Sequence, residues 1–224
     1  FKTESHGRTG RGKMQPAAGS PKSSILRKDH PMKLLGSSTS PYVRKCRVAV
    51  IELGLSDSVE HLNVPPTSDE ISAANPLLKV PTLIRDNGEA LFDSRIILRF
   101  LNEYVGGPLY PVGHWDVQRR ESQAEGLIDA ALLLRAEMAS RPEDKRWDGW
   151  IETQSTKINR ALDAMEREAA ALGTIDSAVI GTACGLGYLD FRFADWGWRD
   201  GRPALAKWFE GFNARPSMQS TMPA

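Results

Sequence analysis

The feature that most constrains the fold is the stretch from Leu34 to Lys45, where a short apolar run gives way to hydroxyl residues and then to a helix-like segment. Four consecutive hydroxyl residues end at Ser40 and precede Pro41, which suits the first helical position because its missing N–H costs little there. The stretch predicts a strand, a polar turn and a helix N-terminus. The turn is either an ordinary helix cap or a helix start that binds an anion, since free N–H groups and the helix dipole favour negative charge there.

Residues 32–107 predict a small α/β unit around this turn. A largely buried helix over 41–54 ends at Gly54, which suits the left-handed position after a helix. A short strand over 59–63 follows and should run parallel to the first strand, because a helix separates the two. A short helix ending near Ala74 completes this half of the unit.

The second half of the unit predicts a hairpin and a helix. The sequence Asp86-Asn87-Gly88 is a strong turn signal between two apolar runs, so the flanking strands should be antiparallel. Pro81 opens the first of these strands, at an edge or irregular position where a cis bond is possible. Ser94 is the expected N-cap of a helix over 95–104. The predicted order is therefore β-α-β-α-β-β-α.

The pattern changes after the expected linker at 108–114, because strand signals stop and helical periodicity continues. This change predicts an all-helical domain over 115–224, and the fold class becomes α/β plus all-α. The segment from 177 to 191 is apolar nearly all round, as expected of a central buried helix, with Asp176 as its N-cap. The predicted helices of this domain cover 115–140, 144–172, 177–191 and 203–214.

Composition and charge narrow the possible functions. The 224-residue chain is 41% hydrophobic and 25% charged, which is enough for a sizeable core, and it has no apolar run long enough for a membrane span. Seven basic and two acidic side chains give residues 1–31 a charge of +5, which leaves −4 for the rest of the net +1. A mildly acidic body argues against nucleic-acid binding, where a basic face is the usual footprint.

The N-terminal residues and the cysteines carry two further expectations. Residues 1–31 are polar and rich in Gly, Ser and Lys, so they are expected to form a disordered extension or a remnant of the expression vector, with Met32 as the natural start. Cys46 and Cys184 lie far apart without C-x-x-C spacing, which indicates a reducing, cytoplasmic setting. Cys46 is expected to be a buried small residue, and so few cysteines and histidines predict no metal site.

Several short motifs follow one another along residues 32–224, and each of them is weak alone. They are Ser40-Pro41-Tyr42-Val43-Arg44-Lys45, Asn75-Pro76-x-x-Lys79-Val80-Pro81, Phe92-Asp93-Ser94, Gly187-Tyr188-Leu189-Asp190-Phe191-Arg192 and Trp196-x-Trp198-Arg199-x-Gly201-Arg202-Pro203 with Arg215-Pro216-Ser217. In this order the set resembles the glutathione transferase superfamily, in particular bacterial members with a hydroxyl at the active position. The resemblance implies a thioredoxin-like N-terminal domain followed by a helical-bundle domain.

The resemblance also implies a glutathione site in the first domain. Lys79, Val80 and Pro81 would bind glutathione, with the Val80 backbone pairing with the cysteinyl part through the bend that a cis-Pro81 permits. Asp93 and Ser94 would hold the γ-glutamyl end. The chemistry agrees, because Ser94 at a helix N-terminus can donate to a carboxylate and Asp93 can accept from an ammonium group.

By the same resemblance, Ser40 stands where thioredoxin-like turns carry the redox cysteine, and the bound anion would be the glutathione thiolate. Lowering a thiol pKa of about 8.5 by about two units needs roughly 2.7 kcal/mol. A hydrogen bond to a charged group supplies about 1.5–3 kcal/mol and a helix terminus up to about 2 kcal/mol, which together suffice. Ser40 is therefore expected to donate a hydrogen bond to the thiolate, with Thr39 and Ser38 as alternative donors.

Two positions depart from the pattern of the family. Leu78 stands where glycine is usual, so the loop before Val80 could take a different shape. Asp93 stands where the commoner residue is glutamate, which is one methylene longer. Asp129 has two interpretations, since it could face the cleft between the domains or be a solvated or hydrogen-bonded structural acid.

The activity implied by the resemblance is attack of glutathione on a small hydrophobic electrophile, or a glutathione-dependent reduction. A wall of the helical domain around Trp115 and Leu127 would receive the electrophile. The alternative is a transferase-like fold that serves as a non-catalytic binding or regulatory module. A two-fold homodimer is the family expectation, and neither a nucleic acid nor a membrane is an expected partner.

Overall fold

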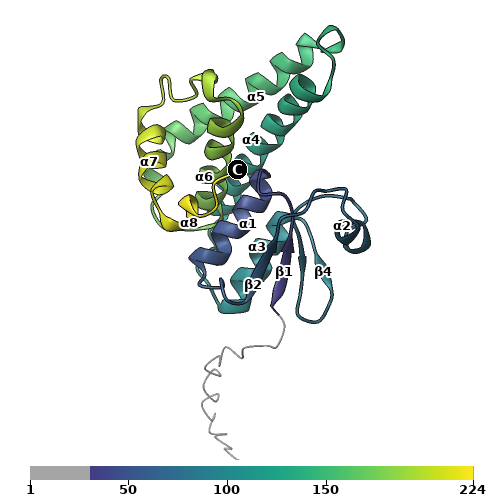
Figure 1. Cartoon of the computed structure of the whole chain (residues 1–224). Helices are drawn as coiled ribbons and strands as arrows, with labels where there is room; N and C mark the ends of the chain where they lie inside the picture. The colour runs from purple at the N-terminus through teal and green to yellow at the C-terminus, as the bar shows by residue number, and fades with distance from the viewer. Residues whose placement is uncertain (1–30, 224) are drawn as a thin grey trace, which may run out of the picture.

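The computed structural model describes residues 31–223, in which a four-stranded sheet with three helices precedes a mostly helical region (Figure 1). The extension expected at 1–31 lies, apart from Pro31, outside the described residues. None of the helices within 31–223 combines the length and apolar character needed to cross a bilayer. The elements are β1 (Met32–Leu35), α1 (Pro41–Glu52), β2 (Val59–Leu62), α2 (Asp69–Ala74), β3 (Thr82–Ile84), β4 (Ala90–Leu91), α3 (Ser94–Val105), α4 (Trp115–Ser140), α5 (Asp148–Arg167), α6 (Ser177–Arg192), α7 (Pro203–Asn213) and α8 (Pro216–Gln219).

The sheet has the strand order β2-β1-β3-β4 and matches the strand directions that the sequence predicts. β1 runs parallel to β2, with Leu34 opposite His61, because α1 carries the chain back between them. β1 is antiparallel to β3, with Leu34 opposite Leu83, and both leucines are buried. β3 and β4 form the predicted antiparallel hairpin, so the central strands place the loop before β3 beside the end of β1.

Helix α1 lies between the sheet and the helical region and packs against both α3 and α6. Val43 and Ala49 are fully buried, and the charged side chains of Arg44 and Lys45 are buried as well. This burial agrees with the prediction that the helix is apolar on more than one face. Gly54 follows the C-cap residue with a φ of +69°, the left-handed conformation expected of a residue that ends a helix.

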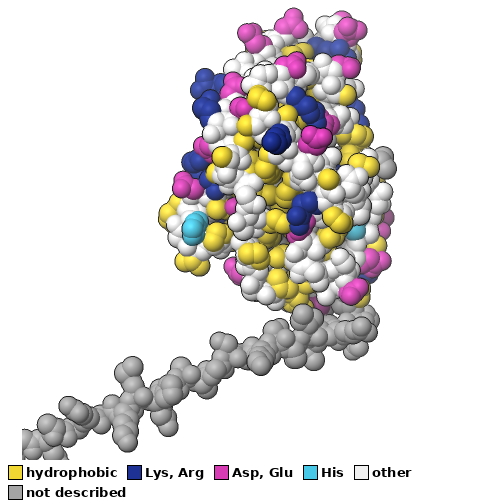
Figure 2. Space-filling model, turned by 90° about the vertical axis from the view of Figure 1, so that its left-hand side faces the viewer, with side chains coloured by type: hydrophobic (Ala, Val, Ile, Leu, Met, Phe, Trp, Pro, Cys, Tyr) yellow, Lys and Arg dark blue, Asp and Glu magenta, His cyan; other side chains and the backbone are white. Residues whose placement is uncertain are grey.

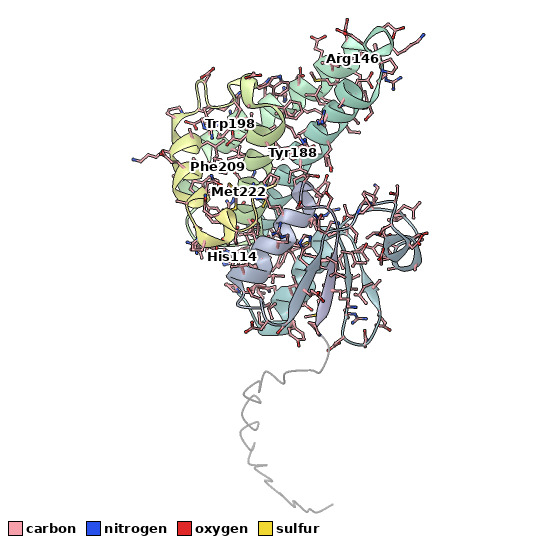
Figure 3. All side chains as sticks on the ribbon, in the orientation of Figure 1. His114, Arg146, Tyr188, Trp198, Phe209 and Met222 are labelled. Carbon is pink, nitrogen blue, oxygen red and sulfur yellow. The ribbon has the colours of Figure 1, made fainter. Side chains whose placement is uncertain are left out.

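The helical region is organised by α4 and α6. The helices α4 and α5 form a long hairpin that extends away from the sheet, with Arg146 at its tip (Figure 1, Figure 3). α6 packs against α4 and α1 and is buried over nearly its whole length, with the predicted cap Asp176 accepting the Val179 N–H at 2.8 Å. Trp198 and Phe209, labelled in Figure 3, form an edge-to-face pair with ring centroids 5.9 Å apart, and this pair fixes the position of α7.

The side of the molecule that carries α7 exposes apolar side chains in a broken band between charged ones (Figure 2). Trp208 and Phe212 of α7 stack there with centroids 5.5 Å apart and, together with Leu172, line a shallow hollow. None of the residues that line this hollow belongs to the predicted glutathione site.

Two sequence predictions about helix ends were wrong, and one short helix was missed. Asp93, and not Ser94, caps α3, because its carboxylate accepts the Arg95 N–H at 3.0 Å and the helix begins at Ser94. The helix predicted over 144–172 is shorter, with α5 flanked by 3₁₀ turns at 143–145 and 169–171. Ala169 in the second of these turns and Leu172 just after it are buried, so the apolar pattern continues past the end of the helix. The four-residue α8 is too short to show a period in the sequence.

Glu52 at the end of α1 fixes the C-terminal segment to the first half of the chain. Its two carboxylate oxygens accept from the Arg215 guanidinium at 2.9 and 2.8 Å, and it also accepts from the Ser217 hydroxyl. The Arg215 hydrogen bonds, assisted by Ser217, hold the pKa of the Glu52 carboxyl below its ordinary value. A carboxyl group whose pKa is lowered by folding stabilises the protein at pH values above its unfolded-state pKa of about 4.3. That stability is lost as the pH falls through the folded-state pKa.

Glu52→Gln should therefore lower the free energy of unfolding at pH 7 by about 1–2 kcal/mol, the range for charged hydrogen bonds that are partly exposed. The difference between wild type and variant should shrink as the pH falls below about 4. Urea denaturation at several pH values measures it, and Glu60→Gln, an exposed residue of β2, is the matched control. A difference that stays constant down to pH 3 would contradict this assignment.

Candidate active site beside the start of helix α1

A cavity of about 210 Å³ lies where the sheet region meets α4. Four parts of the chain contribute to it: the first turn of α1, the loop before β3, the start of α3 and one side of α4. Five residues expected to bind glutathione, Lys79, Val80, Pro81, Asp93 and Ser94, all line this cavity. The remaining lining residues are Tyr42, Asn75, Leu77, Phe92, Arg95, Glu125 and Asp129.

The loop before β3 is held in shape by the buried side chain of Asn75. Its amide donates to the Lys79 carbonyl at 2.9 Å and to the Thr82 hydroxyl at 3.0 Å, and its oxygen accepts the Leu77 N–H at 2.9 Å. The Val80–Pro81 bond is cis. Asn75 thereby ties the backbone before Val80 to the Thr82 side chain after it, a role that the sequence motif alone does not reveal.

Leu78, which stands where glycine is usual in the family, has a left-handed backbone conformation. Its φ of +50° lies in the left-handed region, which glycine adopts without a steric penalty and other residues adopt at a cost. The loop therefore has the backbone conformation that a glycine would favour, although leucine stands there. Leu78 is exposed, so its side chain is not packed in the core.

The start of α3 presents one exposed and one buried group. Asp93 caps the helix and also lies 3.4 Å from the Arg95 guanidinium, with more than half of its side chain exposed. Ser94 is buried at the first helical position. A carboxylate beside free N–H groups can hold the ammonium and carboxylate of an amino-acid end at the same time.

The hydroxyl turn before α1 divides its hydrogen bonds among its members. The Ser37 and Thr39 hydroxyls bond to each other at 2.9 Å, and the Ser38 N–H donates to the Asn63 side chain at 3.0 Å. Ser40 is the N-cap, and its oxygen accepts the Val43 N–H at 3.4 Å. Accepting this bond uses a lone pair and leaves the Ser40 O–H proton available for another acceptor. Ser38, Thr39 and Ser40 stand at the helix start and are not among the residues that line the cavity.

Helix α4 contributes two carboxylates, one turn apart, to the cavity. Asp129 accepts a hydrogen bond from the Tyr42 hydroxyl, and Glu125 pairs with the ammonium of Lys45. Burial, and then the hydrogen bond to Asp129, raise the pKa of Tyr42, so its hydroxyl keeps its proton at neutral pH. Burial also raises the pKa of the Glu125 carboxyl, against the opposing effect of the Lys45 ammonium.

Neither Trp115 nor Leu127, around which the wall for the electrophile was expected, lines this cavity. The Trp115 side chain is 75% exposed, and Leu127 is buried in the core. The α4 residues that do line the cavity, Glu125 and Asp129, are spaced four apart, so they share one side of the helix. This i, i+4 spacing was visible in the sequence, but it did not indicate which side of the helix faces the cavity. Asp129 is thus both a cleft residue and a hydrogen-bonded acid.

Neither cysteine is placed for chemistry at this cavity. Cys46 and Cys184 are both fully buried, and burial raises the pKa of each thiol, to about 11 for Cys184. A thiolate is the reactive form of cysteine, so both residues remain inert at neutral pH. The prediction that Cys46 is a buried small residue is confirmed.

Comparison with known proteins identifies the family of the chain. A model of the glutathione S-transferase N-terminal domain matches residues 34–108. The GST-like protein YibF of Escherichia coli K12 is 36% identical over 202 residues, which cover 86% of this chain and 98% of that protein. A glutathione transferase family member from Pseudomonas fluorescens Pf-5, crystallised with bound glutathione, is 40% identical with a TM-score of 0.82 and covers 86% of this chain and 99% of that one.

Two further relatives extend the comparison. A glutathione S-transferase from Methylobacillus flagellatus KT, solved with glutathione bound, is 34% identical with a TM-score of 0.80 and covers 86% of this chain and 100% of that one. A stringent starvation protein A homolog from Haemophilus ducreyi is 27% identical over 155 residues, 66% of this chain and 64% of that protein. The chain belongs to the glutathione S-transferase superfamily, and the predicted family and fold class are confirmed.

Breaking the Lys45–Glu125 pair should have a large effect on stability. Lys45 is fully buried, and its removal leaves the Glu125 carboxylate without its counter-charge. Lys45→Met should destabilise the protein by about 3–5 kcal/mol, the range for breaking a buried ion pair from one side. The double variant Lys45→Met/Glu125→Met should regain most of that loss. Thermal unfolding of both variants, with Lys33→Met as the exposed control, measures the effect. A double variant no more stable than Lys45→Met would contradict the pairing.

Proposed function

We propose that the protein is a glutathione transferase that binds glutathione in the cavity beside α1 and activates its thiol as a thiolate. The observation that carries this proposal is the convergence of two segments far apart in sequence, Lys79–Pro81 and Asp93–Ser94, on one cavity next to the N-terminus of α1. Solved relatives at 40% and 34% identity carry glutathione, which supports the same ligand here.

Each part of glutathione has a chemically suitable group in this cavity. The Val80 backbone offers an N–H and a carbonyl to the cysteinyl part, in a loop fixed by Asn75. Asp93 offers a carboxylate to the γ-glutamyl ammonium, and Ser94 offers a hydroxyl and an N–H to the γ-glutamyl carboxylate. The Lys79 ammonium is exposed and suits the second carboxylate of the tripeptide.

Ser40 is the proposed donor to the glutathione sulfur. Its oxygen already accepts from the Val43 N–H, so its own proton is free to donate. Thr39 and Ser38 remain the alternative donors. The Thr39 hydroxyl is already hydrogen-bonded to the Ser37 hydroxyl. The single proton of the Tyr42 hydroxyl is engaged by Asp129, and this hydrogen bond argues against Tyr42 in that role. The positive end of the α1 dipole stabilises the same charge.

In the proposed reaction the thiol gives its proton to solvent, and the sulfur lone pair attacks an electrophilic carbon. A sulfur–carbon bond forms, and the bond from that carbon to the leaving group breaks, with the electron pair leaving on that group. Ser40 keeps its own proton throughout, since it stabilises the thiolate and does not attack.

A second candidate function is a transferase-like binding or regulatory module without turnover. A relative at 27% identity is named for stringent starvation and not for a transfer reaction. This relationship favours testing the second candidate. Both candidates require glutathione binding and differ only in the formation of a conjugate with an electrophile.

Ser40→Ala should raise the pKa of the bound glutathione thiol by roughly one to two units, the equivalent of one hydrogen bond to a charged group. An ultraviolet titration of thiolate absorbance in the complex measures this pKa. Ser56→Ala, an exposed serine outside the turn, is the control and should leave the pKa unchanged. An unchanged pKa in Ser40→Ala would overturn its role, and the same titration of Thr39→Ala and Ser38→Ala would then identify the donor.

Asp93→Asn should weaken glutathione binding about 10- to 100-fold, because it removes the charge that faces the ammonium group. Asparagine caps a helix as well as aspartate does, so α3 should remain intact. Calorimetric titration with glutathione measures the change, and Asp57→Asn on the surface is the matched control. Unaltered affinity in Asp93→Asn would show that the γ-glutamyl end lies elsewhere, and no binding by the wild type would overturn the proposed function.

A further inference from the structure

We infer that Asp129 determines the specificity for the second substrate, and that it favours an electrophile carrying a cationic or hydrogen-bond-donating group over an anionic one. This inference rests on the proposed function, because it concerns the second substrate of the same site. It changes the expected substrate class from simply hydrophobic to one that is polar at the end facing α4.

The side chains that α1 and α4 contribute to the cavity are Tyr42, Glu125 and Asp129, and none of them is aliphatic. The apolar members of the lining, among them Val80, Pro81 and Phe92, all come from the sheet region, which is the proposed glutathione side. The second substrate must meet the helical side, so polar groups face it there.

Counting protons shows that this helical side is an acceptor. A tyrosine hydroxyl has one proton, and Tyr42 donates it to Asp129, so the Tyr42 oxygen offers only lone pairs to the cavity. Ionised carboxylates are acceptors only, and each has more lone-pair positions than the single bond described for it uses. A ligand that brings N–H or O–H groups satisfies these acceptors, whereas an anionic ligand leaves them unpaired.

The charges of the cavity make Asp129 the decisive residue. Glu125 is neutralised by the buried Lys45, and Asp93 lies beside Arg95. Asp129 is exposed, and among the described residues 31–223 it takes part in no ion pair with a lysine, arginine or histidine. Its charge therefore acts on whatever enters the cavity from the helical side.

Binding of three S-substituted glutathiones tests this inference without requiring turnover. The probes are S-benzylglutathione and its para-trimethylammonium and para-carboxylate derivatives, which differ in the charge presented to α4. The wild type should bind the cationic probe at least about tenfold more tightly than the anionic one in calorimetric titration at low salt. Asp129→Asn keeps an oxygen that can accept from Tyr42 but removes the charge, and it should reduce that ratio about tenfold.

Asp116→Asn makes the same change on the same helix outside the cavity and should leave the ratio unchanged. Tyr42→Phe should also keep most of the charge preference, because Asp129 remains. Equal binding of the charged probes by the wild type, or an unaltered ratio in Asp129→Asn, overturns the inference. Loss of affinity for glutathione itself in Asp129→Asn, with the ratio unaltered, would overturn it too, since the carboxylate would then serve the γ-glutamyl ammonium.

The proposed function fails separately from this inference. If the wild type binds neither glutathione nor any of its S-substituted forms, both are wrong. If all probes bind without regard to charge, the glutathione site stands and only the specificity of Asp129 is wrong.

Discussion

The structure depends on the burial of α1 between the sheet and the helical region. This helix packs against α3 on one side and α6 on the other, and its buried Lys45 pairs with Glu125 of α4. Arg44 is buried too and donates to the Met218 carbonyl at 3.1 Å, which joins α8 to the same helix. A helix held from so many directions has a fixed N-terminus, and that N-terminus is where the proposed site needs a stationary hydrogen-bond donor.

This constraint also explains why the site combines parts of the chain that are remote in sequence. The parallel pairing of β1 with β2 and the antiparallel pairing of β1 with β3 bring the Val80–Pro81 loop near the turn that ends at Ser40. The same α1 that begins at this turn contacts α4 through Tyr42 and Lys45, so the cavity receives Asp129 from the second half of the chain. The proposed glutathione side and the proposed second-substrate side thus belong to different regions joined by one helix.

Much of this arrangement could be predicted from the sequence, and the rest depended on packing. Strand directions and the buried α6 followed from hairpin signals and continuous apolar residues, which are local or strongly periodic. The wall around Trp115 and Leu127 was wrong because periodicity gives the apolar side of a helix and does not give the polar side that faces a cavity. Tyr42 was visible in the Ser40-Pro41-Tyr42 motif, but its bond to Asp129 spans 87 residues and needs the tertiary structure.

The proposed function requires that the sulfur of bound glutathione lies at the start of α1 and accepts a hydrogen bond from Ser40. A crystal structure of the protein with glutathione tests it most directly. The sulfur should lie within hydrogen-bonding distance of the Ser40 Oγ, with the cysteinyl backbone paired to Val80 and the γ-glutamyl end at Asp93 and Ser94. A sulfur that lies away from the α1 N-terminus, or that is hydrogen-bonded to the Tyr42 hydroxyl instead, would contradict this role of Ser40.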